Sequence, residues 1–163
     1  MNFTSAITIC IQKYVDFGGR ATRREFWFYT LFVQLLFLCS SFLDPYIAGV
    51  SPESYYTIFG PATLVVQVLT LLPSLSVTAR RLQDTGASGW WMLIALTGIG
   101  LVPLIYWLCD PSDETENSFG KSPLDVYGEG VTSPVPAPVK FVLLPITILV
   151  CALSVASIYF FSE

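Results

Sequence analysis

Long apolar stretches alternate with short polar segments along this chain. Four stretches contain no charged residue and approach the length of a membrane-spanning helix: residues 26–43, 58–79, 90–109 and 141–161. A helix rises about 1.5 Å per residue, so roughly 20 residues cross the ~30 Å hydrocarbon core of a bilayer. The pattern predicts an all-α integral membrane protein, a polytopic helical bundle with a three-helix core and a fourth, C-terminal transmembrane helix.

The first fifteen residues show a different, amphipathic pattern. Apolar residues recur at helical spacing on one face, and polar residues occupy most of the other: Phe3, Ile7, Cys10, Ile11 and Tyr14 against Ser5, Thr8, Gln12 and Lys13. Such a helix either lies in the headgroup region of a membrane or packs on its own bundle. The sequence predicts an N-terminal interfacial amphipathic helix and leaves both arrangements open.

Two polar positions predict where helices begin. The run from Thr22 to Glu25 matches a capping box, in which the Thr22 hydroxyl accepts from the Glu25 amide and the Glu25 carboxylate returns to the Thr22 amide. Ser88 is placed to cap the third apolar stretch in a similar way, without an acidic partner.

Composition agrees with a membrane protein. Of the 163 residues, 53% are hydrophobic and only 12% are charged, about half the roughly 25% that is usual in soluble domains. The chain has no histidine, which excludes imidazole acid–base chemistry and histidine-ligated metal sites. Its four cysteines form no Cys-x-x-Cys pair, so we expect no metal site.

The distribution of basic residues predicts the topology. Six of the eight basic residues precede the first apolar stretch or separate the second from the third: Lys13, Arg20, Arg23, Arg24, Arg80 and Arg81. The positive-inside rule makes both regions cytoplasmic. A third crossing then places residues 110–140 outside, and the fourth returns the C-terminus to the cytoplasm. In this arrangement Cys39 and Cys109 lie near the same outer boundary, and the sequence leaves open whether they pair.

The pattern divides the chain into three parts. Residues 1–125 form a membrane domain with transmembrane segments at about 26–43, 58–79 and 90–109. Residues 126–140 contain Pro134, Pro136 and Pro138 in alternation, which favours an extended extracytoplasmic spacer. Residues 141–163 add a further transmembrane helix.

Three blocks resemble a known family. They are residues 14–27 (YVDFGGRATRREFW), 80–91 (RRLQDTGASGWW) and 116–123 (ENSFGKSP). Their order and spacing are similar to those of small bacterial inner-membrane proteins catalogued as domain of unknown function 805. The resemblance implies a multi-pass protein of the bacterial inner (plasma) membrane with no established activity. Gln83 departs from the family hairpin, which usually reads Arg-Arg-Leu-His-Asp, so any proton chemistry of that histidine is absent here.

The charged residues of the first two blocks form the candidate site. It consists of Arg20, Arg23, Arg24, Glu25, Arg80, Arg81 and Asp84. One interpretation is a structural salt-bridge cluster that joins the first helix to the third. The other is a site for an anionic lipid headgroup, because guanidinium groups hold phosphate bidentately. Four aromatic residues near helix ends are expected to be interfacial anchors: Trp27, Trp90, Trp91 and Trp107.

No catalytic residue is expected, because the apolar stretches lack charged groups and the candidate nucleophiles Ser74 and Ser76 have no identifiable base. We expect no cofactor, no metal and no nucleic acid. The sequence favours a non-enzymatic module that associates with itself, with other membrane proteins or with anionic lipid through an Arg-rich cytoplasmic face. The alternative is a small transporter or channel component that acts as an oligomer.

Overall fold

The computed structural model describes residues 1–49, 51 and 60–126. These residues form helices that are joined by loops and turns. The elements in order are α1 (Phe3–Gln12), α2 (Arg23–Ala48), α3 (Pro61–Asp84), the 3-10 helix η2 (Gly89–Thr97), α4 (Leu101–Cys109) and the short α5 (Pro123–Val126). The Pro-rich spacer after Val126 and the fourth apolar stretch lie outside the described residues.

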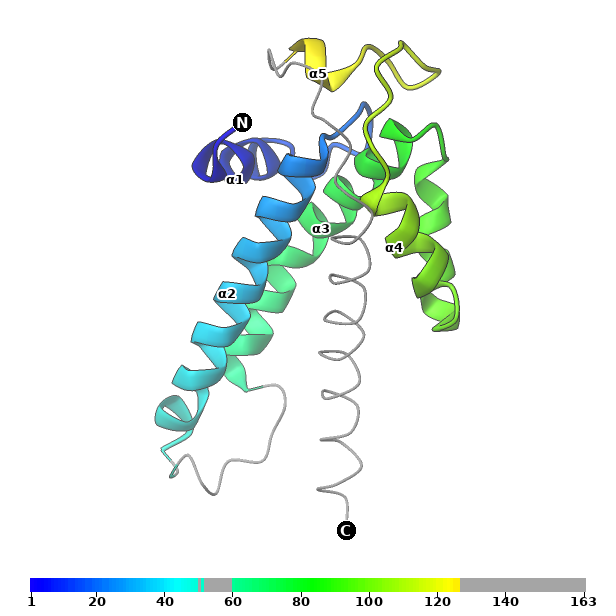
Figure 1. The fold of residues 1–163 in the computed structure, drawn as a ribbon. Helices are drawn as coiled ribbons and strands as arrows, with labels where there is room; N and C mark the ends of the chain where they lie inside the picture. Colours follow the sequence, from blue (N-terminus) through cyan, green and yellow to red (C-terminus); the bar gives the residue numbers. More distant parts are fainter. Residues whose placement is uncertain (50, 52–59, 127–163) are drawn as a thin grey trace. The chain divides into compact units, whose positions relative to one another are not determined.

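Helices α2 and α3 are the two long helices and run side by side (Figure 1). Among the described residues they are the two helices long and apolar enough to cross a membrane. Helix α2 begins directly after Thr22, as the predicted cap indicates, because the Thr22 hydroxyl accepts from the Glu25 amide at 3.1 Å. It ends at Gly49, whose positive φ of 69° closes the last turn. Their outward faces are apolar and exposed: Leu31, Leu35, Leu38, Phe42, Leu64, Val65, Val68 and Leu72.

A buried carboxylate joins these two helices at the end far from Thr22. Asp44, on α2, accepts from the Ala62 amide at 2.7 Å and from the Thr63 hydroxyl at 2.6 Å. The Thr63 hydroxyl also lies 3.1 Å from Ser40 Oγ. Asp44 therefore supplies the N-terminal cap of α3 from a neighbouring helix, where the helix dipole favours a negative charge.

Helix α1 lies across the start of α2 (Figure 1). Ala6 and Cys10 are buried against the bundle, and the Phe3 ring contacts that of Phe28 edge-on at 5.9 Å between centroids. Ile11 remains more than half exposed. Helix α1 thus packs on its own bundle with one side and leaves apolar side chains on another.

The prediction of a single transmembrane helix over residues 90–109 is wrong. This stretch forms two nine-residue helices, η2 and α4, separated by a turn at residues 98–100. Gly98 adopts a φ of 71°, and a Cβ on Gly100 would lie 2.1 Å from the carbonyl oxygen of Ile94. Glycine is required at both positions because of this conformation and this close approach. Hydropathy alone does not distinguish a continuous helix from two short antiparallel ones.

The core therefore differs from the expected three-helix bundle. Helices α1, α2 and α3 pack together, and η2 and α4 cover α3 near its C-terminal end. The Trp91 ring near the start of η2 meets the Trp107 ring near the end of α4 edge to face, with 5.6 Å between the ring centroids. This contact joins the two short helices at the ends that lie away from the turn between them. Apolar residues from α1, α2, α3 and α4 meet in one cluster, which includes Cys10, Phe26, Val77 and Leu104.

Candidate functional site: a buried charged junction

Asp84, the last residue of α3, binds two arginines at once. Its Oδ1 accepts from Arg20 Nε at 2.9 Å, and its Oδ2 accepts from Arg81 Nη1 at 2.5 Å. The side chains of Arg20 and Asp84 are 1% and 0% exposed, and that of Arg81 is 0% exposed. Such charges are stable away from water only because each is paired and hydrogen-bonded. We call these three residues the Asp84 group.

The remaining donors of Arg20 bind the loop that follows α4. Nη1 donates to the carbonyl oxygens of Thr115 at 2.6 Å and Gly120 at 3.3 Å, and Nη2 donates to that of Asp113. The Asp113 carboxylate accepts from the Thr115 amide and hydroxyl, and these bonds lower the pKa of that carboxyl. The loop is thus folded so that its carbonyls face Arg20.

Arg81 holds the end of α4 in the same way. Its Nε donates to the Leu108 carbonyl at 3.2 Å, and its Nη2 donates to the Asp110 carbonyl. Asn117 adds a third connection, because its Nδ2 donates to the Gln83 carbonyl at 3.0 Å. Asn117 also accepts from the Phe119 amide and pairs with Gly120 through the backbone, which closes the turn of the third sequence block.

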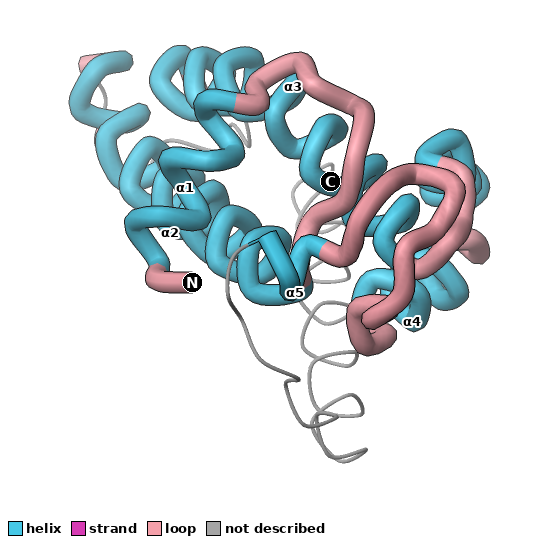
Figure 2. Tube along the Cα trace, turned by 90° about the horizontal axis from the view of Figure 1, so that it is seen from above, coloured by secondary structure: helices cyan, strands magenta, loops and turns pink. Residues whose placement is uncertain are grey.

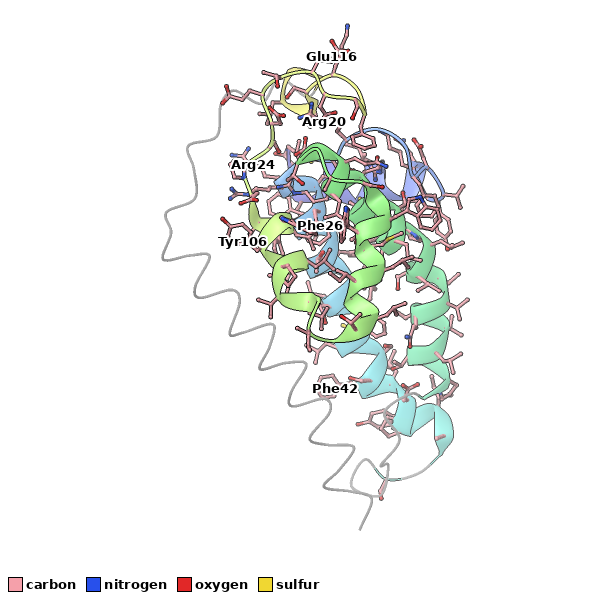
Figure 3. All side chains as sticks on the ribbon, turned by 90° about the vertical axis from the view of Figure 1, so that its right-hand side faces the viewer. Arg20, Arg24, Phe26, Phe42, Tyr106 and Glu116 are labelled. Atoms are coloured by element: carbon pink, nitrogen blue, oxygen red, sulfur yellow. The ribbon has the colours of Figure 1, made fainter. Side chains whose placement is uncertain are left out.

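These bonds correct the predicted position of residues 110–122. The sequence predicts this segment on the opposite side of the membrane from the arginines. Instead it packs on them, and Figure 3 shows Glu116 and Arg20 at the same end of the bundle, with Phe42 toward the other end. Figure 2 looks onto this end, where the loop before α2 and the loop after α4 both face the viewer. The cause is the chain reversal between η2 and α4.

A second buried pair lies between α2 and α3. Arg80 Nη1 donates to Glu25 Oε1 at 2.5 Å, with both side chains fully buried. Glu25 Oε2 and the Nε and Nη2 of Arg80 have no hydrogen-bond partner. The predicted capping box is therefore half formed, because the Glu25 carboxylate turns to Arg80 rather than to the Thr22 amide.

Cys10 of α1 completes this second pair. Its Sγ lies 3.8 Å from Glu25 Oε1 and donates to it. Burial, followed by the nearby Glu25 charge, raises the pKa of the Cys10 thiol to about 12. The thiol is therefore neutral at physiological pH and serves as a hydrogen-bond donor, not as a nucleophile.

The structure thus places five of the seven candidate residues in two buried groups. Arg23 and Arg24 lie outside them: Arg23 is half-buried and Arg24 is exposed. Ser88 caps η2 as expected, accepting from the Trp90 amide at 3.4 Å. Cys39 and Cys109 are not joined to each other by a disulfide.

The four tryptophans follow the ends of the helices as the sequence indicates. Trp90 is 75% exposed and Trp91 half exposed at the start of η2, whereas Trp27 and Trp107 are partly buried against the core. Their role as interfacial anchors stays a prediction.

A cavity of about 490 Å³ lies where the three sequence blocks meet. Its lining is mainly apolar and comes from all three blocks and from the residues on either side of the second: Phe17, Ala79, Gln83, Ser88, Gly89, Trp90, Met92 and Phe119. The side-chain Oε1 of Gln83 is buried without a partner. Gly89 is needed at this place, because a Cβ would lie 3.0 Å from that of Ala79.

Sequence reasoning missed several residues of this junction. The Thr115 and Gly120 carbonyls have no signal in a sequence, because any residue type supplies a backbone oxygen. Cys10 and Asp44 look like an apolar position and a loop acid, and only packing makes them partners of Glu25 and Thr63.

The charges of the junction are satisfied mainly from within the chain. Arg20 and Arg81 share one carboxylate and bind carbonyl oxygens with their other donors. Arg80 shares Glu25 with Cys10. No guanidinium of these three is exposed to receive a phosphate bidentately, so the geometry favours the structural salt-bridge interpretation over the headgroup site for these arginines.

Comparison with known proteins covers the same part of the chain. Residues 14–121 match the model of a family described as protein of unknown function (DUF805). The chain is 35% identical over 114 residues to inner membrane protein YhaH of Escherichia coli (strain K12), covering 69% of this chain and 91% of that protein. It is 28% identical over 114 residues to inner membrane protein YhaI of the same strain, covering 69% and 90%. No solved structure matches.

Proposed function

Because this chain belongs to the DUF805 family of bacterial inner-membrane proteins, we propose that it is a non-enzymatic membrane module. It associates with other membrane proteins or with anionic lipid through the cytoplasmic face that surrounds the buried junction. Helices α2 and α3 anchor this face in the bilayer.

The burial of Arg20, Arg80 and Arg81 is the observation that carries the proposal. Each of these arginines forms an ion pair with a buried carboxylate of the same chain. Their role is therefore to hold the helices together, and they are not a ligand site. Four described basic residues are not fully buried, and two of them lie together at the start of α2: Arg23 and Arg24, besides Lys13 and Lys121. Basic side chains next to a membrane attract anionic lipid by about 1 kcal/mol each.

The chemistry of the buried groups supports a non-enzymatic role. Catalysis needs a nucleophile or a base that reaches a substrate. Glu25 and Asp84 are fully buried and held by arginines, and the thiol of Cys10 is neutral and enclosed. Glu25, Asp84 and Cys10 therefore act as partners in buried ion pairs and hydrogen bonds and do not reach a substrate.

The proposal is tested by native mass spectrometry of the full chain, extracted in a polymer that retains the surrounding lipid. We expect either a defined extra protein mass or retained anionic lipid. The double variant Arg23→Gln/Arg24→Gln lowers retention of anionic lipid roughly 25-fold, the equivalent of about 2 kcal/mol. The matched control, Arg23→Lys/Arg24→Lys, keeps both positive charges at the start of α2 and retains more lipid.

The opposite results contradict the proposal. A chain that carries neither partner nor anionic lipid is not such a module. Protein-dependent flux of a solute panel into liposomes would instead favour the alternative, a small transporter or channel component that acts as an oligomer.

A further inference from the structure

We infer that η2 and α4 form a re-entrant hairpin, which enters one leaflet of the bilayer and returns to the side from which it came. The partner of this surface is the hydrocarbon of that leaflet. The tip of the hairpin carries its most exposed apolar side chains, with Leu96 84% and Ile99 86% exposed. Between Asp84 and Asp110 the chain contains no charged residue.

The length of the two helices fits half a bilayer. Nine residues of 3-10 helix span about 18 Å, and nine residues of α-helix span about 14 Å. Neither reaches the ~30 Å needed to cross the hydrocarbon core. Helices α2 and α3, with 26 and 24 residues, do reach it. In Figure 1 the turn between η2 and α4 lies well short of the far end of α2 and α3.

Both ends of the hairpin are attached to the same buried group. Helix η2 begins five residues after Asp84, and α4 ends where Arg81 binds the carbonyls of Leu108 and Asp110. Arg81 is fully buried, so a crossing by residues 90–109 would leave its charge without these acceptors. Separating the two ends therefore requires breaking the hydrogen bonds from Arg81 to the Leu108 and Asp110 carbonyls.

The turn is built to tolerate a surrounding without water. Backbone amides in hydrocarbon must find partners within the protein. All four amides from Gly98 to Leu101 do so. They donate in order to the Ala95 carbonyl at 3.1 Å, the Thr97 carbonyl at 2.9 Å, the Thr97 hydroxyl at 3.0 Å and the Gly98 carbonyl at 3.2 Å.

The exposed tip continues the lipid-facing surface of the long helices. The outward faces of α2 and α3 are apolar and exposed in the same manner, and η2 packs on α3. One hydrophobic surface thus runs from two spanning helices onto the hairpin. Its consequence is that residues 110–122 lie on the same side of the membrane as residues 13–22.

Accessibility of single cysteines tests this consequence. The background keeps the buried Cys10 and Cys109 and replaces Cys39 and Cys151 with Ala; without an added cysteine it gives the baseline. Gly18→Cys, Lys121→Cys and Ser51→Cys are each treated with a membrane-impermeant maleimide in right-side-out and inverted vesicles. We expect positions 18 and 121 to react in the same vesicles and position 51 in the opposite ones. Reaction of 121 together with 51 would overturn the inference.

A distance measurement tests the hairpin without vesicle orientation. Spin labels at Gly18→Cys and Lys121→Cys are expected to lie well under 30 Å apart in the full chain in lipid nanodiscs, because Arg20 binds the Gly120 carbonyl. A third crossing would separate them by the ~30 Å core or more. Such a separation contradicts the hairpin. A label at Ile99 alone does not discriminate, since both arrangements place that residue near mid-membrane.

Discussion

Arg20 and Asp84 form a buried ion pair between residues 64 positions apart, with 2.9 Å between Nε and Oδ1. Arg20 lies just before the Thr22 cap of α2, and Asp84 is the last residue of α3. The pair therefore joins the ends of the two long helices. Because Asp84 also holds Arg81, one carboxylate keeps both helices and the loop after α4 together.

Removing this carboxylate charge is expected to destabilise the protein strongly. Asp84→Asn leaves Arg20 and Arg81 buried without a counter-charge, and breaking a buried pair from one side costs roughly 3–5 kcal/mol. Thermal unfolding of the purified chain, followed by circular dichroism, measures the loss. The control Glu114→Gln removes an exposed carboxylate and leaves the midpoint nearly unchanged. Equal midpoints for the two variants would show that Asp84 is not the centre of the junction.

The Glu25–Arg80 pair predicts a different pattern of energies. Glu25→Met and Arg80→Met each leave one buried charge alone and lower stability by roughly 3–5 kcal/mol. The double variant removes both charges together with their unpartnered atoms, so it loses less than either single variant. A double-mutant cycle of unfolding midpoints checks this expectation. Strictly additive losses would mean that the two side chains do not interact.

The turn of the hairpin predicts a glycine requirement. Gly100→Ala places a Cβ 2.1 Å from the Ile94 carbonyl oxygen, so the backbone must move, at a cost of at least the roughly 1–3 kcal/mol of overpacking. Displacement of α4 then changes the fluorescence of the Trp91–Trp107 pair. The control Gly18→Ala meets only the Asp16 carboxylate at an ordinary 3.5 Å. An unchanged spectrum and midpoint for Gly100→Ala would contradict this geometry of the turn.

The pKa of Cys10 predicts slow modification and a loss of stability at high pH. With the pKa raised to about 12, the folded thiol stays protonated at pH 8, and iodoacetamide modifies it much more slowly than in the denatured chain. Above about pH 9 the unfolded state releases this proton while the folded state keeps it. Stability therefore falls as pH rises between about 9 and 12.

Site-resolved mass spectrometry of the alkylated chain measures the rate for Cys10. Cys10→Ala is the matched variant for the pH profile and loses the part of the alkaline destabilisation that the thiol causes. Rapid modification of folded Cys10 at pH 8 would show that its site is open.

Local signals in the sequence account for much of the molecule. The absence of charges over the first two apolar stretches predicts two long helices, and the structure has them as α2 and α3. Thr22 and Ser88 cap helices as predicted. The two arginine blocks were predicted to meet, and five of their charged residues are in buried ion pairs. These features depend on residues that are neighbours in the chain or on hydrophobicity alone, and both can be read directly from the sequence.

The sequence by itself determined the class of protein, the two long helices and the candidate charged residues. The tertiary structure alone decided that residues 90–109 reverse direction, that Arg20 and Arg81 bind carbonyls of residues 108–120, and that Cys10 and Asp44 have partners. The physical reason is that hydropathy reports the preference for lipid and not the direction of the chain. A glycine turn and backbone acceptors become specific only when distant segments meet.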